Sequence, residues 1–140
     1  MSDLRAKAEQ IRTQILQGGR GITRFTPDEM DLLEFQLGQF AVGTQDWGHL
    51  RDILFLLEHS MTTDRRFEVG LMTLLKRHEL DSDLLIFLLN TSRKHIITAR
   101  FKDGQRLDFA FLDVLQKLIY HPDPEVVEWV LRTIEECGNQ

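Results

Sequence analysis

Near its end the chain reads His121-Pro122-Asp123-Pro124-Glu125-Val126-Val127, with helically spaced apolar residues on both sides. Proline cannot continue a helix and moves the preceding residue out of the α region, so the helix before this stretch has to end near Tyr120. Asp123 can accept hydrogen bonds from the free amides of a new helix, and Pro124 suits the first helical position. The stretch therefore predicts a tight corner between two helices.

Apolar residues at three- and four-residue steps extend this helical pattern over the whole chain. The clearest helix start is Thr26-Pro27-Asp28-Glu29, where Thr26 and Glu29 have the spacing of a capping box. Phe109 opens the apolar stripe of the sixth predicted helix. The pattern predicts an all-α fold of about seven helices in antiparallel hairpins, over residues 3–17, 26–43, 46–57, 63–75, 81–98, 109–119 and 123–134.

Composition predicts one soluble domain over residues 1–140. The chain has 42% apolar and 28% charged residues, which is typical of a globular protein with a real core. Its single cysteine, Cys137, excludes an internal disulfide and suits a reducing compartment. The N-terminus lacks the apolar run of a secretory signal, and no apolar run approaches the roughly 18 residues that span a bilayer. We therefore expect a cytoplasmic protein.

Three predicted helix starts, at Asp46, Asp81 and Asp123, lie 35 and 42 residues apart, which leaves open a short α-solenoid or an orthogonal helical bundle. Over residues 112–138 the corner at Asp123 and the apolar residues after it resemble the inter-repeat turn of HEAT-like repeat proteins. The chain departs from that pattern at Val127, where an arginine is usual, and at Trp129, where an alanine is usual. The resemblance implies a helical scaffold that binds other molecules.

Residues 96–109 contain the dipeptide Asp103-Gly104 between short runs in which apolar and polar residues alternate. This arrangement is typical of a β-hairpin with a tight turn. An isolated hairpin is marginal in water unless it packs on something. We therefore favour the alternative, an elongated interhelical loop in which Ile96 and Ile97 finish the preceding helix.

Basic residues gather in the middle of a chain whose net charge is −5. Residues 61–106 carry a net charge of +3, whereas the flanking parts are acidic. A basic surface can bind phosphates or an acidic protein, and a half-exposed tryptophan can anchor an interface. The predicted partner-binding residues are Arg65, Arg66, Arg93, Lys94, Arg100, Lys102 and Trp129.

Catalytic motifs are missing from the sequence. None of the five histidines has a second histidine three or four residues away, as a helical zinc site would need, and each is expected at a helix end. The glycine-rich segment 18–21 lacks the lysine and hydroxyl of a phosphate-binding loop and is expected to be a flexible connection. We therefore expect no metal, no cofactor and no enzymatic activity.

The remaining function class is recognition. The sequence predicts a non-catalytic module that binds another protein, and it leaves open both an acidic partner and self-association. The alternative is a helical domain that binds nucleic acid or phosphate through the same basic residues. Binding to phosphates weakens steeply with salt, whereas binding in an apolar groove does not, so salt dependence separates the two.

Overall fold

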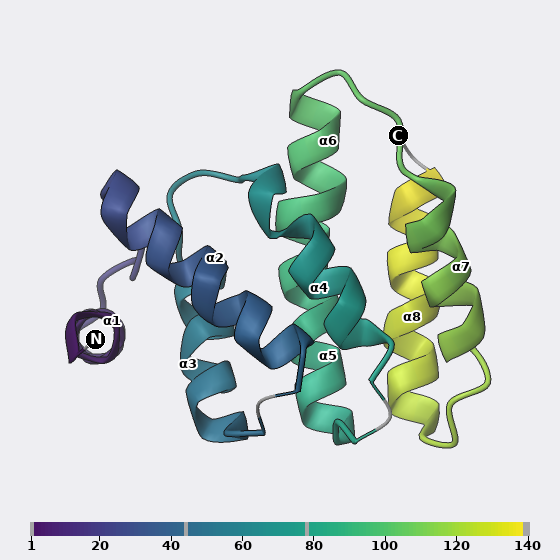
Figure 1. The fold of residues 1–140 in the computed structure, drawn as a ribbon, viewed down its shortest axis with the longest axis horizontal. Coiled ribbons are helices and arrows are strands. Elements are labelled where there is room, and N and C mark those ends of the chain that lie inside the picture. The colour runs from purple at the N-terminus through teal and green to yellow at the C-terminus, as the bar shows by residue number, and fades with distance from the viewer. Residues whose placement is uncertain (1, 44, 78, 139–140) are drawn as a thin grey trace. The chain divides into compact units, whose positions relative to one another are not determined.

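All regular elements of the computed structural model, which describes residues 2–43, 45–77 and 79–138, are helices (Figure 1). The protein is all-α, as the apolar periodicity predicts. Residues 82–102 form one continuous helix, and residues 65–75 form another. Counted in this way, the described residues form seven helical segments in the seven predicted places. No helix in this part of the chain is long and apolar enough to span a membrane. The elements are α1 (Ser2–Leu16), α2 (Pro27–Ala41), α3 (Trp47–Glu58), η1 (Arg65–Phe67), α4 (Glu68–Leu75), α5 (Ser82–Ser92), η2 (Arg93–Thr98), α6 (Ala99–Lys102), α7 (Phe109–Leu118) and α8 (Pro124–Gly138).

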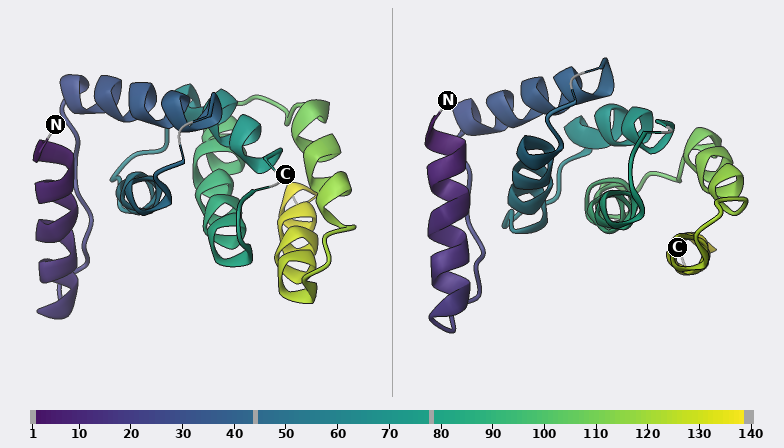
Figure 2. Two further views of the ribbon diagram at one scale, coloured as in Figure 1. Left: turned by 60° about the horizontal axis from the view of Figure 1, so that its bottom comes forward. Right: turned by 90° about the horizontal axis from the view of Figure 1, so that it is seen from below.

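The helices divide into two compact units, residues 1–62 and residues 63–140, within what the composition predicts to be a single domain. In the first unit, α2 begins beside one end of α1 and runs away from it, and α3 packs against both helices (Figure 2). The predicted capping box starts α2: the Glu29 amide donates to Thr26 Oγ1 at 3.1 Å, and the Thr26 amide donates to Glu29 Oε1 at 2.8 Å. The buried apolar residues of the three helices are Leu4, Ala8, Ile11, Leu33, Leu37, Phe40, Leu50, Ile53, Leu54, Leu56 and Leu57.

The glycine-rich connection after α1 has a defined conformation. Gly18 has φ +85°, its amide donates to the Ile15 carbonyl at 3.0 Å, and the Gly19 amide donates to the Gln14 carbonyl at 2.7 Å. These two bonds form a Schellman motif, which satisfies the last carbonyls of the helix. Gly21 is buried with φ +65°. The segment is therefore a built turn, where the sequence predicts a flexible connection.

In the second unit α8 lies alongside both α5 and α7 (Figure 1). The predicted corner is present, since Asp123 Oδ1 accepts from the Glu125 amide at 2.9 Å and the Asp123 carbonyl accepts from the Val127 amide at 3.2 Å. Asp81 and Asp108 cap α5 and α7 in the same way. The buried apolar residues of this unit are Phe67, Leu71, Leu74, Leu75, Leu80, Leu84, Leu85, Leu88, Leu89, Ile96, Ile97, Ala99, Phe111, Val114, Leu115, Val126 and Val130.

Helix α5 continues without a break through the π-helical turn η2 into α6, so that one helix runs from Ser82 to Lys102. Two buried hydroxyls precede the π turn and donate to carbonyls four residues back, Thr91 to Phe87 at 3.0 Å and Ser92 to Leu88 at 2.8 Å. Such bonds compete with the helical ladder and tend to bend it. They therefore mark the place where the helix leaves α geometry.

The hairpin interpretation of residues 96–109 is wrong. Ile96 and Ile97 belong to the preceding helix, as the alternative predicts, but the helix extends further, to Lys102. Gly104 has φ +70°, its amide donates to the Phe101 carbonyl at 3.1 Å, and the Gln105 amide donates to the Arg100 carbonyl at 2.9 Å. The Asp-Gly dipeptide therefore ends a helix in a second Schellman motif.

Candidate functional site

Three of the predicted binding arginines are engaged with carboxylates of their own unit. Arg100 donates to Glu68 from Nε at 2.5 Å and from Nη2 at 2.8 Å. Arg65 Nη1 lies 3.7 Å from Asp103 Oδ2. Arg93 Nε donates to a carboxylate oxygen of Glu136. Arg100 thus links α6 to α4, Arg65 links η1 to the end of α6, and Arg93 links η2 to α8. The positive charge of each arginine is largely offset by its carboxylate partner.

The other predicted binding residues are spread over the unit. Lys102 is exposed at the end of α6, while Arg66 and Lys94 are half-buried. Trp129 is half-buried on α8, and the guanidinium of Arg132 lies 5.0 Å from the centre of its ring. Neither of the two cavities described next is lined by any of the seven residues. Their role in binding stays a prediction.

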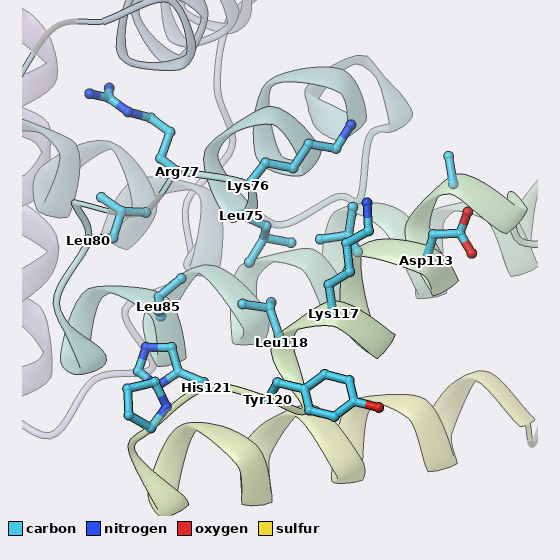
Figure 3. Close-up of a pocket in the computed structure, with 13 residues that line it drawn as sticks. Leu75, Lys76, Arg77, Leu80, Leu85, Asp113, Lys117, Leu118, Tyr120 and His121 are labelled. Carbon is cyan, nitrogen blue, oxygen red and sulfur yellow. The ribbon is translucent and has the colours of Figure 1, made fainter.

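A hollow opens instead between α4, α5, α7 and the turn after α7; we call it the α4–α7 groove (Figure 3). Its volume is about 680 Å³, which lies in the usual range of ligand sites. Five aliphatic side chains form its floor, and three cationic side chains and Asp113 add charge. The lining residues are Leu75, Lys76, Arg77, Leu80, Leu85, Ala110, Asp113, Val114, Lys117, Leu118, Tyr120, His121 and Pro122.

The groove has two free cations on its edge. Lys76 and Lys117 are both exposed, and neither forms an ion pair with any residue in the described ranges. They extend to the same side of the groove, whereas Arg77 points away from them (Figure 3). Arg77 Nε also pairs with Glu79 Oε2 at 2.8 Å. The lysines are therefore the groups that can meet an anionic ligand.

The helix corner that dominates the sequence forms one end of this groove. His121 Nδ1 accepts from the Asp123 amide at 3.0 Å, which fixes the turn that carries Tyr120. The hydrogen bond from the Ser82 hydroxyl, followed by the one from the Glu125 amide, holds the pKa of Asp123 below its usual range. Tyr120 itself is 88% exposed. The corner thus presents an aromatic ring beside the leucine floor on a rigid support.

A second cavity of about 710 Å³ lies between α6, the following loop, α7 and the end of α8. Its wall includes Ile97, Leu112 and Ile134, together with Cys137. Burial, reinforced by the negative charge of Glu136, raises the pKa of Cys137 to about 11. The thiol is therefore a poor nucleophile at neutral pH, because the thiolate is the reactive form.

The histidines that the structure describes have structural contacts. His95 is fully buried inside the continuous helix, not at a helix end as expected, and its Nδ1 accepts from the Asp64 amide at 3.1 Å. His49 Nε2 lies 2.8 Å from Gln36 Oε1, and His59 ends α3. His78 lies outside the described residues. Within the described ranges, no three histidine, cysteine, aspartate or glutamate side chains gather where they could hold a metal ion.

Sequence reasoning missed most of the groove. Lys76 belongs to the basic middle of the chain, whereas Lys117 lies in its acidic last part. Tyr120 is predicted only as the end of a helix. Phe109, expected on the buried stripe of α7, is 82% exposed. The exposure of Phe109 and Tyr120 could not be read from helical spacing, because both lie at helix ends where the chain leaves the periodic pattern.

No family model matches this sequence, and neither the curated proteins nor the solved structures contain a match to it. The functional interpretation therefore rests on the geometry and charges of the chain itself.

Proposed function

We propose that the protein is a non-catalytic protein-binding module, and that residues 63–140 hold a segment of the partner in the α4–α7 groove. The observation that carries the proposal is a hollow of about 680 Å³ lined by aliphatic side chains, beside two exposed lysines for which the described residues provide no ion pair. Burying apolar surface stabilises a complex by about 25 cal/mol per Å². The lining residues that still expose apolar surface include Leu118, which is half-buried, and Tyr120, which is 88% exposed.

The charges of the described residues favour a protein over a nucleic acid. The whole chain has a net charge of −5, whereas domains that bind nucleic acid are commonly basic. Three arginines of the predicted basic surface already pair with Glu68, Glu136 and Asp103. Two free lysines and an apolar floor suit a polypeptide segment better than a row of phosphates. Binding to nucleic acid is therefore the weaker alternative, recognisable by a steep loss of affinity with salt.

The resemblance to HEAT-like repeats remains part of this proposal. Scaffolds of that kind bind partners along helical surfaces, and the corner at Asp123 that carries the resemblance also forms one end of the groove. The proposal does not depend on the resemblance, because the groove is defined by its own residues.

A groove-blocking variant tests the proposal. Ala110 is exposed on the first turn of α7 and lines the groove, so Ala110→Trp fills the groove without disturbing the core, and Ala110→Ser is the matched control. Peptides displayed from a proteome library should be enriched on the wild-type protein and on Ala110→Ser, and lost on Ala110→Trp. No enrichment on the wild type, or enrichment that survives Ala110→Trp, would contradict the proposal.

A further inference from the structure

We infer that the segment held in the α4–α7 groove is an acidic amphipathic peptide, with at least two carboxylates for Lys76 and Lys117 and a large apolar side chain for the leucine floor. The inference rests on the proposed function and adds the chemistry of the partner to it. The residues that bind the partner's charges are then Lys76 and Lys117 beside one cavity, and not the dispersed basic residues that the sequence predicts.

Charge complementarity selects the acidic character of the peptide. Lys76 and Lys117 line the groove beside one carboxylate, Asp113, while the charge of Arg77 is paired with Glu79. Rim charges of this kind steer association and reject wrongly charged partners more than they add affinity. A basic segment would be repelled by the exposed ammonium groups of Lys76 and Lys117, whereas an acidic segment would neutralise them.

The floor selects the apolar character. Leu75, Leu85 and Val114 are buried in the unit, and each still forms part of the wall of the groove. Leu118 is half-buried beside them. Aliphatic walls bind an aliphatic or aromatic side chain without directional demands, so the peptide needs one or two bulky apolar residues at this place.

The exposed ring of Tyr120 gives the peptide a further contact. Tyrosine combines a broad apolar face with a polar tip and is enriched among the residues that dominate interface energetics. Tyr120 is 88% exposed and stands on the turn that His121 and Asp123 fix. Because the backbone beside Tyr120 is already held in this turn, covering the ring has to order only its side chain.

Charge reversal tests the inference. Peptides enriched on the wild-type protein should carry a net negative charge and bulky apolar residues, and they should bind Lys76→Glu/Lys117→Glu at least tenfold more weakly. That variant should in turn enrich basic amphipathic peptides. The matched control is Arg20→Glu/Arg106→Glu, which reverses two exposed charges outside the groove and should bind the acidic peptides like the wild type.

The outcomes separate the inference from the proposed function. Neutral or basic peptides that bind the wild type and are lost on Ala110→Trp would overturn the inference and keep the protein-binding function. Equal binding of acidic peptides to Lys76→Glu/Lys117→Glu would do the same. Absence of any enriched peptide would overturn both.

Two other occupants can be recognised with the same variants. Fluorescently labelled dodecanoate that binds the wild type but not Ala110→Trp, with no peptide enriched, would assign the groove to a small amphiphile. Self-association in sedimentation that Ala110→Trp abolishes would assign it to a second copy of the chain. Either result overturns the inference.

Discussion

Arg100 holds Glu68 with a two-pronged contact, Nε to Oε1 at 2.5 Å and Nη2 to Oε2 at 2.8 Å, that ties the last turn of the long helix to the first turn of α4. Only 13% of the arginine side chain and 12% of the glutamate side chain are exposed. The hydrogen bond that Arg100 donates to Glu68 raises the pKa of Arg100, so the guanidinium stays charged at all ordinary pH values. The positive charge of Arg100, which the sequence predicts to bind a partner, therefore stabilises the fold instead.

We expect Glu68→Gln to destabilise the protein by about 2–4 kcal/mol, because it leaves the guanidinium of Arg100 largely buried without a counter-charge. Arg100→Lys should also destabilise, since lysine cannot form the bidentate contact. Urea unfolding followed by circular dichroism measures both. The double variant Glu68→Leu/Arg100→Met should cost less than the sum of Glu68→Leu and Arg100→Met measured separately, and strict additivity would show that the two residues are not coupled.

Gly21 and Gly38 should respond in opposite ways to the same substitution. Gly21 has φ +65°, and a Cβ there would lie 2.6 Å from Ile15 Cγ1, so we expect Gly21→Ala to cost about 1–3 kcal/mol. Gly38 lies inside α2 and a Cβ there would meet nothing within 4 Å, so Gly38→Ala should stabilise by about 0.5–1 kcal/mol. Thermal unfolding of the two variants checks the contrast. A neutral Gly21→Ala would show that the turn after α1 adjusts freely.

Cys137 should react slowly with alkylating reagents. With a pKa of about 11, only about one thiol in a thousand is ionised at about pH 8, against about a quarter for an unperturbed cysteine. We therefore expect iodoacetamide to modify the folded protein about a hundredfold more slowly than the guanidinium-unfolded protein. The rate should rise steeply toward pH 11. Equal rates in the folded and unfolded chain would mean that the end of α8 does not bury the thiol.

Asp123 should make stability depend on pH in the acidic range. Its folded-state pKa lies below the unfolded value of about 3.9, so the carboxylate adds stability above about pH 4 and loses it as the pH falls through the folded-state pKa. The stability difference between the wild type and Asp123→Asn should therefore shrink on acidification. Urea unfolding between about pH 2.5 and pH 6 measures it. Ser82→Ala removes the largest cause of the lowered pKa and should move the transition toward pH 4.

Local signals in the sequence predict the helices well. Thr26 and Glu29 form their capping box as expected, because both partners lie within one turn of the same helix. The Asp-Gly signal misleads for an equally local reason: a glycine with positive φ serves a hairpin turn and a Schellman motif alike. Only the length of the helix that precedes Gly104 separates these two outcomes.

The candidate site is far less predictable from the sequence. Lys76 and Lys117 line the same groove because α4 packs against α7, and no spacing in the sequence indicates this contact. The ion pairs of the predicted binding arginines are equally absent from the sequence pattern, because Glu68 and Glu136 lie on other helices than Arg100 and Arg93. The sequence shows which residues carry a charge, but tertiary packing decides whether each of them forms an ion pair within the fold or can bind a partner.

The π turn between Arg93 and Thr98 gives the long helix a spare residue. A wider turn takes up one amino acid without passing on the rotation of about 100° that an inserted residue causes in an α-helix. Losing one residue within this turn would convert it to α geometry and leave Arg100 facing α4, whereas the same loss inside α7 would turn every later side chain away from its neighbours. The long helix can therefore lose one residue at this place and keep the core contacts on both sides of the turn.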